Sequence, residues 1–261
     1  MGDEKLVSLR GVLERLDSVA VALSGGVDSA LLLRACREWV PGRVLAATAA
    51  SRLHPFSDLA VAVGRALDVE VRFLRAEPLD DERFRRNPRD RCLICKRMIM
   101  GALVELAREE GIEAALEGSV TDDLEEHRPG RRALEELGVR SPLVEVGLSK
   151  AEVRLVAQSW SIPVSERPPD TCLATRFPRG EELTDSALRR VARAEEYLRG
   201  LVSGPLRVRA HGRTARIEVD AEQIERLVQP GVRREVGERL ESIGFSHVAV
   251  DLAGYRSGSM D

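Results

Sequence analysis

The sequence predicts an α/β protein with a doubly wound parallel sheet, followed by a smaller C-terminal α+β domain. Two observations predict the sheet. Short, uninterrupted apolar runs are typical of parallel strands that are buried on both faces, and helical patterns alternate with these runs along the chain. A third observation predicts the second domain. After a proline-rich and charged stretch at 163–182 the alternation stops, and paired strands are followed by two helical patterns.

The elements of the sheet domain follow from these patterns in order. The first apolar run, 19–23, is the first expected strand, and the helix after it, 30–40, ends at Pro41 and Gly42. Ser149 and Glu152 have the spacing of a capping box at the start of the last helix. The elements between them are a strand at 44–50, a helix at 56–67, a strand at 69–74, an irregular charged stretch at 77–91, a helix at 97–110, a strand at 114–116 and the helix at 149–160.

The second domain has a different order of predicted strands and helices. A hairpin turn is expected at His211 and Gly212, between two short strand patterns. Its elements are a helix at 184–201, strands at 206–210 and 215–219, helices at 221–228 and 232–243, and a strand at 247–252. We therefore expect a first domain over 1–165, a connecting loop over 166–182 that carries a cysteine, and a second domain over 183–261.

The amino-acid composition is that of a globular protein rather than a membrane protein. The chain is 43% hydrophobic and 32% charged, as in ordinary globular proteins, and no apolar run approaches the roughly 20 residues that span a bilayer. We expect a cytoplasmic protein without a membrane or nucleic-acid partner, since the N-terminus lacks a signal pattern and the net charge is −3. Three of the 40 basic residues are lysines, at Lys5, Lys96 and Lys150.

A turn rich in glycine and serine follows the first strand and opens the first helix of the sheet. Gly25 and Gly26 allow backbone N–H groups to approach phosphate oxygens, and the helix N-terminus favours the negative charge. Ser24 and Ser29 can donate hydroxyls, and Asp28 can hold Mg²⁺. The turn lacks the Gly-Lys-Ser/Thr ending of a Walker A loop. It predicts a pyrophosphate site of a different kind.

The pyrophosphate site is expected to include more than this turn. Ligands bind at the carboxyl ends of the strands in such sheets. Gly118 follows the strand at 114–116, so it belongs to the same edge as the turn. We expect Gly118 to contribute to nucleotide binding.

Four cysteines divide into three kinds. Cys92 and Cys95 form a Cys-x-x-Cys pair, which in a reducing compartment is typical of a metal or redox site. Cys172 lies in the loop near Arg167, Arg176 and Arg179, which should lower its pKa and favour the thiolate. Cys36 lies in an apolar helix and is expected to be a small core residue.

The turn at 24–29 is similar to that of the PP-loop ATP pyrophosphatases, which split ATP between its α and β phosphates and transfer AMP to a substrate oxygen. Several further blocks resemble the LarE-type ATP-dependent sulfur transferases of that superfamily. They are 87–96, 117–118 with 122–123 and 128–130, 138–150, 172–180 and 251–260. The resemblance covers nearly the whole chain. It implies adenylylation of a carboxylate of pyridinium-3,5-biscarboxylic acid mononucleotide and its conversion to a thiocarboxylate, in nickel-pincer nucleotide biosynthesis.

The resemblance leaves two sulfur routes open. In one, the cysteine that matches Cys172 gives up its own sulfur. In the other, cysteines that match Cys92, Cys95 and Cys172 hold a [4Fe–4S] cluster, and an added sulfide is the donor. The Cys-x-x-Cys pair favours the cluster, because the sacrificial members lack it. A structural zinc site with three cysteines and a fourth ligand is the alternative metal centre.

The resemblance also assigns anion-binding roles. Arg207 and Arg209 alternate on one strand face and match the family's phosphate-binding strand, and Arg176 has a spacing from Cys172 that suits the same anion. Lys96 is expected to neutralise the pyrophosphate or the adenylate, whereas Lys150 is expected to have a structural or oligomer role. The family implies a homo-oligomer and a small-molecule nucleotide substrate with sulfide or another sulfur donor.

Two other functions compete with this interpretation. A tRNA thiolase of the same superfamily would need a basic RNA-binding surface, which the near-neutral charge disfavours. A non-catalytic nucleotide-binding protein would bind ATP without releasing pyrophosphate.

Overall fold

The protein is described by a computed structural model over residues 2–53, 57–125, 130–162, 164, 171–256 and 259–260. The chain divides into two compact units. The first consists of Met1–Pro78 and Asp90–Pro169, and the second consists of Leu79–Arg89 and Asp170–Asp261. Segment Leu79–Arg89, which the sequence analysis placed in the first domain, thus groups with the C-terminal residues. The domain limits proposed from the sequence stay a prediction, and 166–170 of the expected connecting loop lies outside the described residues.

The first unit is built on a four-stranded parallel sheet. Its strands are β1 (Val19–Ala22), β2 (Val44–Ala49), β3 (Val71–Leu74) and β4 (Ala114–Leu116). Their order is β3-β2-β1-β4, and every neighbouring pair is parallel. The chain moves outward from β1 to β3 and then returns to the other side of β1. The strand order therefore reverses between β1 and β4, and this is the point at which such sheets bind ligands.

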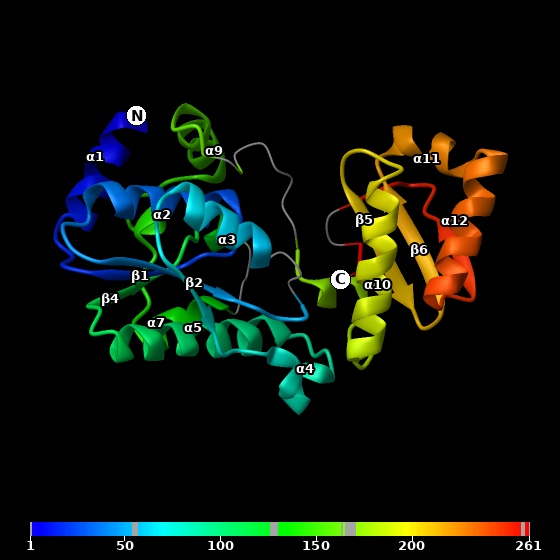
Figure 1. Cartoon of the computed structure of the whole chain (residues 1–261), viewed down its shortest axis with the longest axis horizontal. Helices are drawn as coiled ribbons and strands as arrows, with labels where there is room; N and C mark the ends of the chain where they lie inside the picture. Colours follow the sequence, from blue (N-terminus) through cyan, green and yellow to red (C-terminus); the bar gives the residue numbers. More distant parts are fainter. Residues whose placement is uncertain are drawn as a thin grey trace. The chain divides into compact units, whose positions relative to one another are not determined.

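Helices cover both faces of this sheet, as the sequence predicts for a doubly wound fold (Figure 1). On one face lie α1 (Gly2–Leu13), α2 (Val27–Trp39), α3 (Ser57–Ala66) and α9 (Lys150–Ser159); on the other lie α5 (Arg91–Glu109) and α7 (Gly130–Leu137). Successive side chains of a strand point to opposite faces. Val19 and Val21 accordingly belong to the core under α2, and Ala20 to the core under α5.

The second unit is a small mixed sheet with helices. Strand β5 (Leu206–His211) pairs antiparallel with β6 (Thr214–Val219), which pairs parallel with β7 (His247–Val250). The expected hairpin is present, and its two-residue turn is Gly212-Arg213, with Gly212 at φ +58. The helices are α10 (Asp185–Arg199), α11 (Ala221–Val228) and α12 (Pro230–Ile243), and short helical segments occur at Glu82–Arg85 (α4) and Leu173–Arg176.

Two helix starts and one additional short helix are among the differences from the sequence expectation. Helix α2 begins at Val27, so Asp28 lies in its first turn. Helix α5 begins at Arg91 rather than at 97, which places both cysteines of the pair inside the helix. Helix α4 interrupts the stretch expected to be irregular. It is capped by Asp81, whose Oδ1 accepts a hydrogen bond from the Arg83 N–H at 2.7 Å.

The remaining described helices of the first unit are short. They are α6 (Asp122–Glu125) and α8 (Pro142–Glu145), and a 3₁₀ turn, Pro78–Asp80, follows β3.

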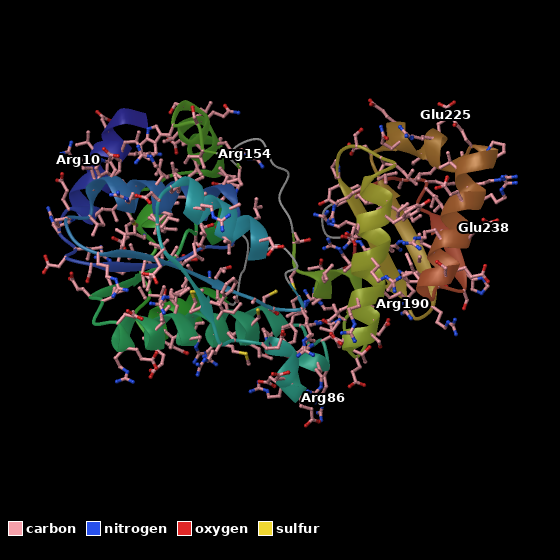
Figure 2. The ribbon with its side chains drawn as sticks, in the orientation of Figure 1. Arg10, Arg86, Arg154, Arg190, Glu225 and Glu238 are labelled. Carbon is pink, nitrogen blue, oxygen red and sulfur yellow. The ribbon has the colours of Figure 1, made fainter. Side chains whose placement is uncertain are left out.

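Figure 2 shows long charged side chains on the outer faces of both units, for example Arg10 of α1 and Glu238 of α12, and both residues are exposed. Among the described helices, none has both the length and the hydrophobicity needed to cross a membrane.

Candidate functional site

A pocket of about 260 Å³ lies at the carboxyl ends of β1, β2 and β4 in the first unit. Its walls come from the turn after β1, the end of β2, the segment after β4 and the middle of α5. The lining residues are Ala22, Leu23, Ser24, Asp28, Ser29, Ala47, Thr48, Ala49, Ile99, Met100, Glu117, Gly118, Ser119 and Asp123. One side is thus apolar and the other carries hydroxyls and carboxylates, which suits a ligand with a flat apolar part and a charged part.

The turn after β1 is held in shape by its two serines. Ser24 Oγ and Ser29 Oγ lie 3.0 Å apart, and Ser29 Oγ donates to the Gly26 carbonyl at 3.1 Å. The Ser24 N–H donates to Ser29 Oγ at 3.2 Å. Gly25 adopts φ +79, a left-handed conformation that side chains rarely tolerate. The serines therefore organise the turn itself.

The N-terminus of α2 opens directly on this pocket. Gly26 is its N-cap, and no side-chain cap hydrogen bond to this helix end occurs among the described residues. Uncapped amides at a helix N-terminus form an anion site. Gly118 lets the end of β4 pack against this turn, because a Cβ at Gly118 would lie 2.9 Å from both Cα and N of Ser29. The predicted contribution of Gly118 thus acquires a physical reason, namely close backbone approach.

Asp28 is the acidic residue of the turn. One carboxylate oxygen, Oδ2, is paired with the ammonium of Lys150. The other, Oδ1, is buried and has no hydrogen-bond partner among the described residues. Burial raises the pKa of Asp28, the hydrogen bond from Lys150 opposes this, and the nearby carboxylate of Asp123 adds to it. A buried, unpartnered carboxylate oxygen beside an anion site fits the requirement for Mg²⁺.

Lys96 lies on α5 at the wall of the pocket and pairs with Glu117. Its Nζ lies 3.1 Å from Glu117 Oε2 and 3.4 Å from Ser119 Oγ. Glu117, 6% exposed, also accepts hydrogen bonds from Ser119 and from the hydroxyl of Ser141. The expected role of Lys96 toward pyrophosphate stays a prediction. Its described partner is this carboxylate.

The contact of Lys150 with Asp28 was not predicted from the sequence, and the structural or oligomer role expected for Lys150 stays a prediction. The rarity of lysine was the available signal. All three lysines pair with carboxylates of the first unit: Lys5 with Glu152 at 2.7 Å, Lys96 with Glu117, and Lys150 with Asp28. The predicted capping box of α9 is present.

The cysteine pair lies on the first two turns of α5. Cys92 and Cys95 are three residues apart and share a helix face with Ile99, which lines the pocket roughly 10 Å further along the axis. Cys92 is exposed and Cys95 is half-buried, and the four cysteines form no disulfide. Two accessible thiols one turn apart suit a soft metal such as iron. Cys36 is a core residue, as expected, and burial raises its pKa.

Cys172 belongs to the second unit and immediately precedes the 3₁₀ turn Leu173–Arg176. Arg176 is fully buried, and its Nε and Nη2 donate to the carboxylate of Glu195 at 2.7 and 3.1 Å. Its Nη1 donates to the hydroxyls of Thr171 and Thr175 at 2.6 and 2.8 Å. The charge of Arg176 is therefore balanced by Glu195, and its expected binding of a substrate anion stays a prediction.

Arg207 and Arg209 lie on one face of β5, as their alternation indicates, and both are buried. Arg209 Nε donates to Glu218 at 2.8 Å, and its Nη1 donates to the Thr175 carbonyl at 2.9 Å. The guanidinium of Arg207 lies 5.3 Å from the ring centre of Tyr255. This face is therefore joined to the segment that carries Cys172, within one unit.

The second unit also contains the segment that leads into the cysteine pair. The side chain of Asn87, which is buried, donates to the Pro178 carbonyl at 2.8 Å, and the Gly180 N–H donates to the Asn87 carbonyl at 3.0 Å. No cluster of three or more metal-binding side chains is assembled among the described residues. The three-cysteine set, which draws on both units, stays a prediction. Arg128, Pro129, Arg167, Ser257 and Gly258 lie outside the described residues.

The sheet order, the turn at its switch point and the acidic residue beside it define an α/β protein with a fold of the PP-loop pyrophosphatase type. No protein-family model matches the sequence. The chain is 34% identical to the pyridinium-3,5-bisthiocarboxylic acid mononucleotide synthase of Lactiplantibacillus plantarum, over 98% of the chain and 94% of that protein. Uncharacterized proteins of Synechocystis and Methanocaldococcus jannaschii are 36% and 26% identical over 100% and 97% of the chain, covering 98% of each relative. The chain belongs to the LarE-type sulfur transferase family.

Proposed function

We propose that this protein converts a carboxylate of pyridinium-3,5-biscarboxylic acid mononucleotide into a thiocarboxylate at the expense of ATP. The observation that carries this proposal is the pocket at the switch point between β1 and β4, in a chain 34% identical to a synthase of the bisthiocarboxylic acid product. The uncapped N-terminus of α2 supplies donors for phosphates, and Ala47, Ala49 and Ile99 supply an apolar wall for the base.

The first step is adenylylation. A carboxylate oxygen of the substrate attacks the α-phosphorus of ATP, the bond to the β-phosphate oxygen breaks, and pyrophosphate leaves. The amides of the turn and the hydroxyls of Ser24 and Ser29 hold the phosphates, and Asp28 holds Mg²⁺, which offsets their charge. Gly118 keeps the space beside Ser29 open for this arrangement.

The second step replaces AMP by sulfur, and the cysteines determine its source. Cys92, Cys95 and Cys172 are proposed to hold a [4Fe–4S] cluster. Their three thiolates would hold the cluster, and the bound cluster would supply an added sulfide that is not part of the protein chain. Support comes from the accessible pair on α5 and from the hydrogen bonds between the segment that precedes it and the segment that follows Cys172.

The second candidate for the sulfur source is Cys172 itself. Its thiolate attacks the acyl carbon of the adenylate and AMP leaves. A base then takes the Cα proton of Cys172, the bond between Cβ and Sγ breaks, and its electron pair leaves with the sulfur as the thiocarboxylate, so that dehydroalanine remains at Cys172. This route needs neither Cys92 nor Cys95, so the two routes differ in their dependence on the pair.

The substrate phosphate is assigned to Arg207 and Arg209, with Arg176 shaping the neighbouring loop. Guanidinium groups match phosphate and carboxylate oxygens bidentately. We further propose a cytoplasmic homo-oligomer, on the resemblance to the family. A tRNA thiolase and a non-catalytic nucleotide-binding protein remain rival candidates, and the experiment below separates all three.

The test is pyrophosphate release with defined substrates. ATP with the pyridinium dicarboxylate should release pyrophosphate, whereas ATP with tRNA should not. Release with neither would favour the non-catalytic protein, and release with tRNA alone would favour the thiolase. Intact mass after turnover then separates the sulfur routes, because a sacrificial Cys172 makes the protein lighter by one H₂S.

A further inference from the structure

The side chain of Lys150 is a charged group beside the pocket that the proposed reaction does not use. Its ammonium pairs with Asp28 Oδ2, although 122 positions separate the two residues in sequence. In a chain with three lysines and 37 arginines, this position has the compact ammonium rather than the planar guanidinium fork. The compact head group is the one that resembles a metal ion most closely in size and charge distribution.

The backbone of Lys150 is held by contacts that do not involve the pairing of its head group with Asp28. Its N–H donates to Asp122 Oδ2 at 2.7 Å. The preceding Ser149 forms the capping box with Glu152, and Glu152 in turn accepts a hydrogen bond from Lys5 at 2.7 Å. The Cα of Lys150 is therefore fixed in position. The side chain is 32% exposed, and its flexible four-carbon stem allows the ammonium to change partner.

Helix stability does not explain a lysine at this position. Lys150 is the first residue of α9, and a cation at a helix N-terminus opposes the helix dipole. The negative charge of Asp28 explains the lysine at position 150. The carboxylate is largely buried, with its side chain 21% exposed, and the carboxylate of Asp123 lies near enough to act on it. A buried charge of this kind needs a cation nearby.

The two oxygens of Asp28 are in different situations. Oδ2 is engaged by Lys150, whereas Oδ1 is buried and without a partner among the described residues. A divalent cation that binds the Asp28 carboxylate lies close to the Lys150 ammonium, because both cations bind the same carboxylate. The two cations repel each other, so occupation by one weakens the hold of the other.

We propose that Lys150 is an exchangeable partner of Asp28. It pairs with Asp28 when no nucleotide is bound, yields the carboxylate to the divalent cation, and then binds the phosphate oxygens with the same ammonium. The phosphate half of this inference rests on the proposed use of ATP. The competition for Asp28 does not.

Two titrations of the Lys150→Met variant test the two halves. Mn²⁺ alone, followed by the paramagnetic resonance of the unbound ion, should bind roughly three- to tenfold more tightly than to the wild type, because a competing cation is gone. α,β-Methylene-ATP with saturating Mg²⁺, followed by calorimetry, should bind roughly tenfold more weakly, because a charge-assisted contact is lost.

Lys5→Met is the matched control, since it removes a lysine of the same unit that pairs with Glu152 rather than with Asp28. It should change neither titration. Mn²⁺ binding to Lys150→Met that is equal to or weaker than that of the wild type would overturn the competition. Unchanged binding of the analogue to that variant would overturn the phosphate half. A wild type that binds Mn²⁺ but no analogue would instead overturn the proposed ATP function.

Discussion

Arg176 and Glu195 form an ion pair that is completely enclosed, with side chains 0% and 1% exposed. Glu195 Oε1 accepts a hydrogen bond from Arg176 Nε at 2.7 Å and from the Val208 N–H of β5 at 3.0 Å. The pair therefore fastens the segment that carries Cys172 to both α10 and β5. The sequence predicts that Arg176 binds the substrate. In the described contacts, Arg176 stabilises the conformation of this loop.

Glu195→Ala should destabilise the second unit strongly, by roughly 3–5 kcal/mol, because it leaves the charge of Arg176 buried without its partner. Loss of hydrogen-exchange protection in the β5 amides measures this. Arg199→Ala is the control, since Arg199 contacts the same carboxylate at 3.5 Å from a side chain that is 41% exposed, and its loss should cost less than about 1 kcal/mol. Equal losses in the two variants would contradict the role assigned to the enclosed pair.

The stability of the first unit should depend on acid through Glu152. The hydrogen bond from Lys5, together with those from Ser149, lowers the pKa of Glu152 from 4.5 to about 2. A depressed folded-state pKa stabilises the protein above the unfolded value, and this contribution is lost as the pH falls from 4.5 towards 2. Urea unfolding at pH 7 should show Glu152→Gln to be less stable than the wild type. The difference should shrink as the pH is lowered from 5 to 3, and a constant difference would count against it.

Gly118→Ala should weaken nucleotide binding by roughly tenfold or more, because the added Cβ would lie 2.9 Å from the Ser29 backbone and force the turn to shift. Calorimetry with α,β-methylene-ATP measures the change. Gly101→Ala in α5 is the matched control, because nothing lies within 4 Å of its added Cβ. That substitution should stabilise the helix by roughly 0.5–1 kcal/mol and leave binding unchanged. Similar effects of both substitutions would refute the close-approach explanation.

Cys92→Ala should abolish the iron–sulfur cluster that anaerobic reconstitution installs, because it removes a thiolate from the proposed set. Iron analysis and the visible absorption of the cluster measure it. Cys36→Ala is the control, since Cys36 is fully buried in the core under α2. It should keep the iron content of the wild type. A cluster retained in Cys92→Ala would eliminate the proposed set and favour the sacrificial role of Cys172.

Much of the fold was predictable because its signals are local. The run at 19–23 predicted β1, the pattern after it predicted helix α2 with a start three residues too late, and Ser149 with Glu152 predicted the capping box. The helix start before Cys92 was missed, although Asp90, a residue type that is common at N-caps, directly precedes the helix. The structure describes no side-chain cap hydrogen bond there.

The amino-acid sequence by itself determined the turn rich in glycine and serine, the alternation of strands and helices, and the position of the cysteine pair. These depend on residues that are neighbours along the chain. Only the tertiary structure decided which charges meet. Asp28 with Lys150 and Arg176 with Glu195 are brought together by the packing of separate elements. The energy of such a pair depends on distance and burial, which no spacing in the sequence specifies.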